Sequence, residues 1–283
     1  MTSVSIVITA YNVESYIAKA IESALTQTHK DLEVVVVCDK PTDNTIDVVK
    51  TFNDNRLKVI ENAENVGAGL SRRIGIENSV GEYVLLLDGD DWINNDFIES
   101  LYNQAVKTNA DIVSGGIIIH RDNGAYDATS YGNCVTEGYD KVLKFWGERI
   151  VFMNNKLIRR KLHEQIPYCH RRYIEDTPVI IPQLWLANKV VYVDNIGYHY
   201  LMREDSLTHT SNAFKNALYR TLCWFDLIDF FNKFDQGMYQ HVNFKNSLNK
   251  ELKILQSIDI TDDLIKPYLR DWLDYSKKVL KYL

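Results

Sequence analysis

Three carboxylates crowd into four positions at the end of an apolar run, in the stretch from Tyr83 to Trp92 (YVLLLDGDDW). Asp and Gly are poor strand residues, so the run predicts a strand that ends at Asp88 and holds the carboxylates at its C-terminal tip. In an open α/β sheet that tip is where ligands bind. Mg²⁺ and Mn²⁺ prefer oxygen ligands and commonly bridge to phosphates. The stretch therefore favours a divalent-metal site over the alternative, an acidic turn before a helix near Asn95.

Polar residues also follow the two earliest predicted strands. The first strand leads into Thr9-Ala10-Tyr11-Asn12, and the second leads into Cys38-Asp39-Lys40-Pro41. Tyr11 and Asp39 at adjacent strand ends could stack on a nucleobase and accept a hydrogen bond from its ring N–H. The alternative is that Tyr11 packs on the helix that follows.

A glycine-containing loop after the third predicted strand suggests a phosphate site. A dinucleotide fingerprint would need glycine at position 72, where this chain has Arg72, and it would follow the first strand. We therefore reject a dinucleotide cofactor. The pair Arg72-Arg73 opens a helix and suits phosphate by charge and by the helix N-terminus. The alternative is two solvated surface arginines.

Alternating strand and helix patterns over the first 120 residues would bring these groups to one edge of a sheet. The expected strands are Ser3–Thr9, Leu32–Cys38, Leu57–Glu61, Tyr83–Asp88 and Asp111–His120. The expected helices are Val13–Gln27, Asp43–Phe52, a helix that follows the Gly67/Gly69 loop and ends at about Ser79, and Asp96–Thr108. This rhythm predicts an α/β fold with a mostly parallel, doubly wound sheet and right-handed crossovers.

The later chain changes character twice. Residues 121–138 are polar and predict a long surface loop. The next expected elements are Tyr139–Trp146 and Tyr173–Ala187 as helices, Lys189–Asp194 and Ile196–Leu201 as strands, and a segment of unassigned type over Val151–Leu162. Beyond Ser206 only helical patterns remain, over 213–234, 240–256 and 261–282. We therefore expect a catalytic domain over 1–208, with halves 1–120 and 121–208, and a C-terminal α-helical appendage over 209–283.

Composition narrows the class of protein. With 46% apolar and 25% charged residues, the 283-residue chain is an ordinary globular protein, and a net charge of −6 argues against nucleic acid as a partner. The four cysteines lie far apart without a C-x-x-C pair and are expected to be free thiols: Cys38, Cys134, Cys169 and Cys223. The apolar start lacks a basic region, and no apolar run approaches about 18 residues. We expect a cytoplasmic protein, with the inner face of the membrane as a further option.

Four ordered motifs together resemble the N-terminal pattern of family 2 glycosyltransferases of the GT-A fold. They are Ser5–Asn12 (SIVITAYN), Asp39-x-x-Thr42-Asp43-Asn44-Thr45, Asn65-x-Gly67…Arg72-x-x-Gly75, and Gly81-Glu82-Tyr83…Leu87–Trp92 (LDGDDW). The resemblance covers about residues 3–210. It implies transfer of a sugar from a nucleotide-diphosphate donor, usually UDP-linked, with inversion at the anomeric carbon. The chain departs from the pattern at Cys38-Asp39-Lys40-Pro41, where the family usually shows Asp-Asp-Gly-Ser, and at Arg73, where Asn is commoner.

The resemblance also implies roles for residues on the donor side. Tyr11 and Asp39 would contact the base, Thr9 and Arg72 the nucleotide, Asp88 the ribose, and Asp90 a Mn²⁺ or Mg²⁺ ion. Asp91 would be either a carboxylate that supports the metal site or a contact to the donor sugar. Arg203 or His199 could approach the diphosphate, with a structural role as the alternative.

On the acceptor side, Glu175-Asp176 resembles the family's Glu-Asp motif, in which a carboxylate is the general base. We assign the base to Asp176, with Glu175 as the competitor, because inverting transfer needs a base opposite the leaving diphosphate. The alternative is two acids favoured by a helix N-terminus. Asn155-Lys156-Leu157 and Tyr198-x-Tyr200-x-x-Arg203-x-x-Ser206 resemble family segments that flank the site.

Two other functions fit the sequence less well than glycosyl transfer. A sugar-1-phosphate nucleotidyltransferase would want a Gly-rich, basic loop after the first strand, which residues 10–14 do not provide. An inactive sugar-nucleotide-binding protein would not need the intact acidic tip or Glu175-Asp176. The expected partners are a nucleotide-sugar donor and a carbohydrate or lipid-linked saccharide acceptor, with a homo-oligomer as an option. The apolar surface of 261–283 has basic neighbours, and we expect it to pack on the catalytic domain or a second subunit rather than on a membrane.

Overall fold

The chain forms two compact units in the computed structural model. The structure describes residues 3–121, 124, 126–130, 132–137, 152–168, 173–203, 212–234 and 244–282. One unit contains Met1–His170 and Val179–Glu204, and the other contains Arg171–Pro178 and Asp205–Leu283. The second unit is thus assembled from two separate stretches of sequence. The domain boundary expected at residue 208 lies outside the described residues and stays a prediction.

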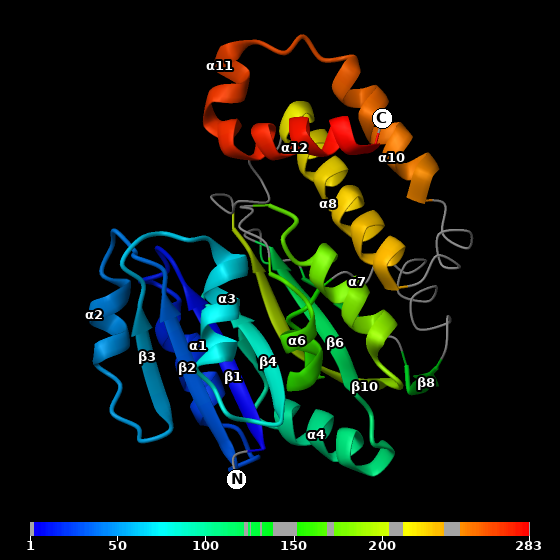
Figure 1. The fold of residues 1–283 in the computed structure, drawn as a ribbon. Coiled ribbons are helices and arrows are strands. Elements are labelled where there is room, and N and C mark those ends of the chain that lie inside the picture. The colour runs from blue at the N-terminus through cyan, green and yellow to red at the C-terminus, as the bar shows by residue number, and fades with distance from the viewer. Residues whose placement is uncertain are drawn as a thin grey trace. The chain divides into compact units, whose positions relative to one another are not determined.

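A single sheet runs through the first unit. Its strands follow the order β3-β2-β1-β4-β9-β6-β10-β5 (Figure 1). The first four strands along the chain pair in parallel: β1 Val4–Ala10, β2 Leu32–Cys38, β3 Leu57–Glu61 and β4 Tyr83–Asp88. In register, Ala10 lies beside Cys38 and Thr9 beside Asp88. The C-terminal ends of β1, β2 and β4 therefore meet at one edge, as the sequence predicts.

The remaining strands make the sheet mixed. They are β5 Trp92–Ile93, β6 Ile112–Arg121, β7 Tyr126–Thr129, β8 Cys134–Thr136, β9 Lys156–Arg159 and β10 Val190–Met202. Strand β9 is antiparallel to both β4 and β6, whereas β10 is parallel to β6. The expected α/β fold is confirmed, and among the described residues every antiparallel pair includes at least one strand that comes after β4.

Two expectations for this region are wrong. Residues 121–138 are not one long loop, because β7 pairs with β6 and β8 pairs with β10. Pairing at an edge uses backbone groups and needs no apolar alternation, so the sequence pattern does not reveal it. The two strands expected over 189–201 are one strand, β10, with register shifts between Tyr192 and Tyr198. The helix expected at Tyr139–Trp146 lies outside the described residues.

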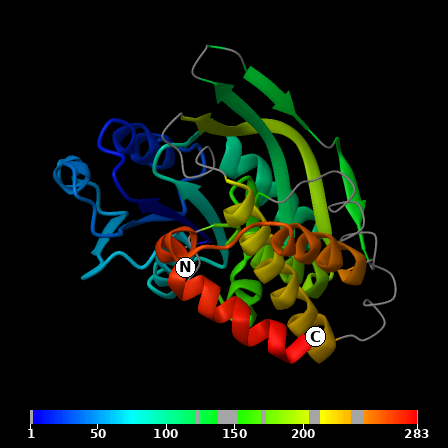
Figure 2. The same cartoon turned by 90° about the horizontal axis from the view of Figure 1, so that it is seen from above.

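Helices cover both faces of the sheet (Figures 1 and 2). Helices α1 Ile17–Leu25, α2 Thr45–Lys50 and α4 Phe97–Thr108 pack against one face, and α3 Ala68–Glu77, α6 Arg160–Gln165 and α7 Thr177–Leu186 lie on the other. Alternate strand residues such as Ile6 and Ile8 point toward α1, because successive strand side chains face opposite ways. Helix α3 approaches closely: a Cβ on Gly75 would lie 2.2 Å from Val7 Cγ1.

The second unit is helical. Its elements are α8 Ala213–Phe234, α10 Phe244–Gln256, α11 Asp262–Ile265, a 3-10 turn Lys266–Tyr268, and α12 Leu269–Tyr282. Trp272 and Tyr275 of α12 pack on a core formed by α8 and α10, so the tail is docked within its own helical unit. Packing of the tail on the catalytic domain or on a second subunit stays a prediction. Tyr173 and Ile174 pack on the same core. In the described part of the chain, no helix is long and apolar enough to cross a membrane.

Candidate active site

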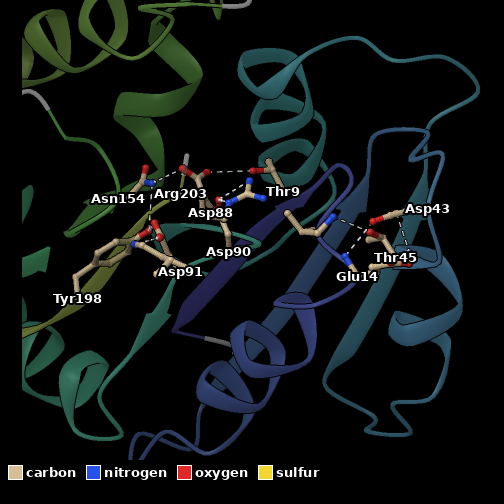
Figure 3. Close-up of polar contacts among 12 residues, drawn as sticks. Thr9, Glu14, Asp43, Thr45, Asp88, Asp90, Asp91, Asn154, Tyr198 and Arg203 are labelled. Atoms are coloured by element: carbon tan, nitrogen blue, oxygen red, sulfur yellow. Dashed lines mark hydrogen bonds and ion pairs between the residues drawn. The ribbon is translucent and has the colours of Figure 1, made fainter. Parts of the chain in front are cut away.

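Asp88, the last residue of β4, is held in place by three side chains. Thr9 Oγ1 donates to Asp88 Oδ1 over 3.1 Å, and Arg72 Nη2 lies 2.9 Å from the same oxygen (Figure 3). Asn154 Nδ2 donates to Asp88 Oδ2 over 2.7 Å. Burial alone would raise the pKa of the Asp88 carboxyl, but the charge of Arg72 and the hydrogen bonds from Arg72, Asn154 and Thr9 lower it overall. Asp88 is therefore an ionised, oriented carboxylate.

Gly89 allows the turn that follows Asp88. Its N–H donates to the carbonyl of Thr9 over 2.9 Å, and a Cβ at this position would lie 2.8 Å from that oxygen. The same Cβ would lie 3.0 Å from Val13 Cγ2. Only glycine lets the β4 tip lie against β1 so closely. This contact separates Asp88 from the two carboxylates that come after it.

Asp91 turns inward rather than toward a ligand. Tyr198 Oη donates to Asp91 Oδ2 over 2.5 Å, and the Leu201 N–H donates to Asp91 Oδ1 over 2.9 Å. The Asp91 side chain is buried, and this burial, with the charges of Asp90 and Asp88, raises the pKa of its carboxyl well above the usual range. Since both oxygens have partners on β10, Asp91 ties the acidic turn to that strand.

A hydrogen-bonded chain connects Asp91 back to Asp88. Asn154 Nδ2 donates to Tyr198 Oη over 3.2 Å as well as to Asp88. Tyr198 is fully buried on β10, and β10 pairs with β5 immediately after the acidic turn. The two outer carboxylates are thus held by one network that spans β4, β10 and the segment before β9.

Asp90, like Asp88, has an arginine partner. Arg203 Nε lies 3.0 Å and Arg203 Nη2 lies 2.9 Å from Asp90 Oδ2. Burial and the neighbouring Asp88 charge raise the pKa of Asp90, and Arg203 opposes that rise. The Arg203 guanidinium also lies 5.0 Å from the centroid of the Tyr16 ring. The structure therefore brings Asp88, Asp90, Asp91, Arg72 and Arg203 together, as the sequence predicted for one site.

The two arginines at the start of α3 have different surroundings. Arg72 is buried against Asp88, whereas Arg73 forms an exposed pair with Glu77 one helical turn later. The expectation of a phosphate site at Arg72 stays a prediction. Arg73 Nη1 also donates to the carbonyl of His163 over 3.5 Å.

Tyr11 and Asp39 lie at neighbouring strand ends, where the Asp39 N–H donates to the carbonyl of Ala10 over 2.9 Å. The Tyr11 side chain is 46% exposed, so part of its ring is accessible to a ligand. Asp39 is buried, and its carboxylate accepts hydrogen bonds from Val66 N–H at 2.9 Å and Gly67 N–H at 2.8 Å. Asp39 therefore shapes the loop that leads into α3, a role that the sequence did not reveal.

Hydrogen bonds join the two loops on either side of this pair. The Thr42 N–H donates to Asn12 Oδ1 over 2.8 Å, and the Glu14 N–H donates to Asp43 Oδ2 over 3.1 Å. Figure 3 shows Glu14, Asp43 and Thr45 as a separate cluster beside the acidic network. Asn12 itself has a φ of 52°, a left-handed conformation that Asn tolerates better than most residues. These contacts fix the loop that carries Tyr11.

Glu175 and Asp176 belong to the second unit, directly before α7. Asp176 Oδ1 accepts a hydrogen bond from Thr177 N–H over 2.7 Å, as an acid at a helix N-terminus can. Ile174, just before the pair, has a φ of 52°, which is rare for a β-branched residue. The assignment of the base to Asp176 or Glu175 stays a prediction.

Sequence reasoning missed Asn154 and placed His199 differently. Asn154 directly precedes Asn155 and Lys156, which are both buried. Its position next to this family segment is the one feature of the sequence that could have pointed to it. His199 stacks on Trp92 with ring centroids 4.9 Å apart and hydrogen-bonds His120 over 2.8 Å. Ser206, the last residue of that predicted motif, lies outside the described residues.

Comparison with known proteins decides the family. The model of glycosyl transferase family 2 matches residues 5–167, which is more than half of the chain and includes the acidic turn. The chain belongs to glycosyl transferase family 2. The resemblance that the sequence motifs indicated is thereby confirmed.

Individual family members resemble the chain over different shares of their length. Glycosyltransferase GlyA of Streptococcus pneumoniae is 31% identical over 72% of this chain, and the match spans 31% of GlyA. GlyG of the same organism is 28% identical over 73% of each chain. Residues 1–349 of Staphylococcus aureus TarS, solved with UDP-GlcNAc, superpose with a TM-score of 0.67 at 22% identity, covering 89% of this chain and 81% of that structure. This likeness shows the GT-A-type fold.

The carboxylates at the C-terminal end of β4 could hold a divalent ion only together with oxygen atoms from a bound ligand, such as phosphates. Among the described residues, no group of three or more His, Cys, Asp or Glu side chains could hold a metal ion. Asp88 and Asp91 have protein partners on both oxygens, which leaves Asp90 as the available carboxylate. Mg²⁺ in phosphate-transfer sites is often held by one or two carboxylates together with substrate phosphates. A single carboxylate at the sheet edge, Asp90, fits that arrangement.

Proposed function

We propose that this chain transfers a sugar from a UDP-linked donor to an acceptor hydroxyl, with inversion at the anomeric carbon and with Mn²⁺ or Mg²⁺. The observation that carries the proposal is the acidic turn of a family 2 chain, in which Asp88 and Asp91 are immobilised and Asp90 faces Arg203. The complex of TarS with UDP-GlcNAc supports a sugar nucleotide as the ligand class. The acceptor we propose is a carbohydrate or a lipid-linked saccharide.

The nucleoside would bind along the ends of β1, β2 and β4. The exposed ring of Tyr11 can stack on the base, and an Asp39 oxygen that accepts one backbone N–H retains a further lone pair for the base N–H. Asp88 would accept from the ribose hydroxyls, since the charge of Arg72 keeps it ionised. Thr9 and Arg72 hold that carboxylate in place.

The diphosphate would lie beside Asp90. A bound Mn²⁺ or Mg²⁺ supplies positive charge that stabilises the leaving diphosphate. Asp90 would hold the ion, and Arg203 would release Asp90 and turn toward the phosphates. A guanidinium suits this exchange because it can pair with a carboxylate or a phosphate in the same geometry. Arg203 thus neutralises Asp90 until the donor binds.

Asp176, or Glu175, would remove the proton from the acceptor hydroxyl as that oxygen attacks the anomeric carbon. A carboxylate can act here at modest basicity, because the hydroxyl proton becomes acidic as the new bond forms. Inversion follows from a single displacement, in which the base and the leaving diphosphate lie on opposite sides of the sugar.

The test is calorimetric binding of UDP with and without Mn²⁺. Asp90→Asn should lose the Mn²⁺-dependent part of UDP affinity. Its melting temperature should stay nearly unchanged, because the Asp90 side chain pairs with Arg203 at the edge of the sheet and contributes little to the apolar core. Asp96→Asn is the matched control, since Asp96 is an exposed carboxylate at the start of α4, only six positions away. Unchanged Mn²⁺-dependent affinity in Asp90→Asn would show that the metal assignment is wrong, and UDP-sugar cleavage by the wild type would then be measured directly.

A further inference from the structure

The outward side of the C-terminal helical segment carries an unusual set of residues. Exposed positions recur every three or four residues, which places them on one side of the helix. We call these residues the basic-leucine face: Lys266, Leu269, Arg270, Leu273, Lys277 and Leu280. The three leucines are 54%, 52% and 86% exposed. Every charged member of the face is positive.

The opposite side of α12 is fastened to its own unit. The rings of Trp272 and Phe214 lie 5.6 Å apart, and Asp271 accepts a hydrogen bond from Tyr219. Lys278 Nζ lies 2.8 Å from Asp226 Oδ1 on α8. The helix is therefore held at fixed orientation by apolar and ionic contacts. The basic-leucine face is presented by a folded element and not by a free tail.

On the helical unit, acidic side chains mostly face inward and basic side chains mostly face solvent. Among its described side chains, the acids on α8 and α12 mostly turn inward to partners, as Asp226 and Asp271 do. Among the side chains of this unit whose exposure is described, eight exposed ones are basic and two are acidic: Arg220, Lys233, Lys250, Lys253, Lys266, Arg270, Lys277 and Lys281, against Asp259 and Asp263. The whole chain carries a net charge of −6. The cationic surface is therefore a local property of this unit.

We propose that the basic-leucine face docks on a bilayer surface rich in anionic lipids. Cations attract the negative surface, and exposed leucines between them can enter the boundary between headgroups and acyl chains. The leucines argue against a soluble polyanion, which offers no apolar region for them. The cations argue against a second copy of the same face, because two such faces would bring like charges together. The inner side of the tail packs on its own unit, and the outer side meets the membrane.

The test uses the full-length chain and sedimentation with vesicles. Vesicles of phosphatidylcholine alone are compared with vesicles that also contain phosphatidylglycerol, at low and high salt. We expect binding to the anionic vesicles that is at least about tenfold tighter and that weakens with salt. The proposal does not depend on glycosyl transfer, so this result and the catalytic assignment can fail separately.

Two variants separate the two kinds of contact. Leu273→Gln with Leu280→Gln removes the apolar part, and Lys266→Gln with Lys277→Gln removes charge. Each should weaken vesicle binding about tenfold or more, while the melting temperature stays close to wild type because all four side chains are exposed. Lys250→Gln with Lys253→Gln on α10 is the matched control, with the same loss of charge on another exposed helix.

Four results would overturn the proposal. One is the absence of binding to anionic vesicles. A second is equal loss of binding in the α10 control, which would indicate a diffuse charge effect. A third is normal binding by the leucine variant together with competition by soluble polyphosphate, which would indicate a polyanion site. The last is a concentration-dependent dimer that the leucine variant dissociates, which would make the face an interface between copies of the chain.

Discussion

At the scale of single residues, three neighbouring carboxylates have three different environments. Asp88 accepts hydrogen bonds and has a lowered pKa, Asp91 is buried with a raised pKa, and Asp90 is paired with Arg203. The difference arises because a glycine turn separates the first from the others and because only Asp91 reaches Tyr198. Similar residue types in adjacent positions therefore serve different purposes. Asp90 is the one for which we propose an exchange of its arginine partner for a ligand.

Substitution of one residue can test the proposed general base, Asp176. Asp176→Asn should keep UDP affinity but lower the transfer rate by about 10²- to 10⁴-fold, the range for loss of a general base. The asparagine side-chain oxygen can still accept from Thr177 N–H, so the start of α7 should remain folded. Calorimetry and a UDP-release assay measure the two quantities. If Asp176→Asn transfers normally and Glu175→Gln is inactive, the base is Glu175.

At the level of elements, a buried histidine of α6, His163, contacts α7. His163 Nδ1 lies 2.7 Å from Tyr168 Oη and 3.0 Å from Gln183 Nε2. Burial, assisted by the charges of Arg160 and Arg73, lowers the pKa of His163 to about 3. His163 is therefore neutral in the folded protein at any pH near neutrality. It will be protonated in the unfolded chain at mildly acidic pH.

This difference makes stability fall in acid. Between the ordinary histidine pKa of about 6.5 and the folded value of about 3, the unfolded chain binds the additional proton, so the free energy of unfolding decreases as the pH falls. Urea unfolding at about pH 7.5 and about pH 5 should show that His163→Gln loses about 2 kcal/mol less than wild type over this interval. Above about pH 6.5 the two proteins should show parallel pH profiles. Equal losses in the two proteins would mean that His163 is not the responsible group.

At the scale of the whole molecule, the candidate site residues are divided between two units. The acidic turn belongs to the sheet unit, whereas Glu175-Asp176 belongs to the helical one. Within the helical unit, Tyr173 packs on Tyr219 with ring centroids 4.9 Å apart, and Lys215 Nζ lies 3.5 Å from the Tyr173 ring centroid. The segment that carries the predicted base is thus anchored to α8.

This division predicts that damage to the α8 core affects transfer more than donor binding. Tyr219→Leu should lower the transfer rate about tenfold or more while changing UDP affinity by less than about twofold, because the ring that supports Tyr173 is lost. Tyr219→Phe should restore transfer, since it keeps the ring. Phe231→Leu, a buried aromatic in the same helix, is the control for general loss of stability. Equal defects in Tyr219→Leu and Phe231→Leu would indicate unfolding of the unit instead.

Local patterns in the sequence predict individual strands and the types of side chain at the C-terminal edge of the sheet. Apolar runs predicted the observed bounds of β2 and β4, because strands that are buried along nearly their whole length show a continuous apolar pattern. The bounds of β3 also match the prediction, although this strand is partly exposed. The same pattern placed Tyr11, Asp39 and Asp88 at strand ends. The family motifs then assigned these positions to a nucleotide.

The tertiary structure alone decided how the side chains are used. The family motifs placed Tyr198 and Arg203 beside the site, but only the pairing of β10 with β5 and β6 brings Tyr198 to Asp91. The motifs did not single out Asn154, which reaches Asp88 from 66 positions away. No local pattern encodes that approach, because contact between distant residues depends on strand order and register. The edge strands β7 and β8 escaped prediction for a related reason. They are specified by backbone partners elsewhere in the chain and not by their own side chains.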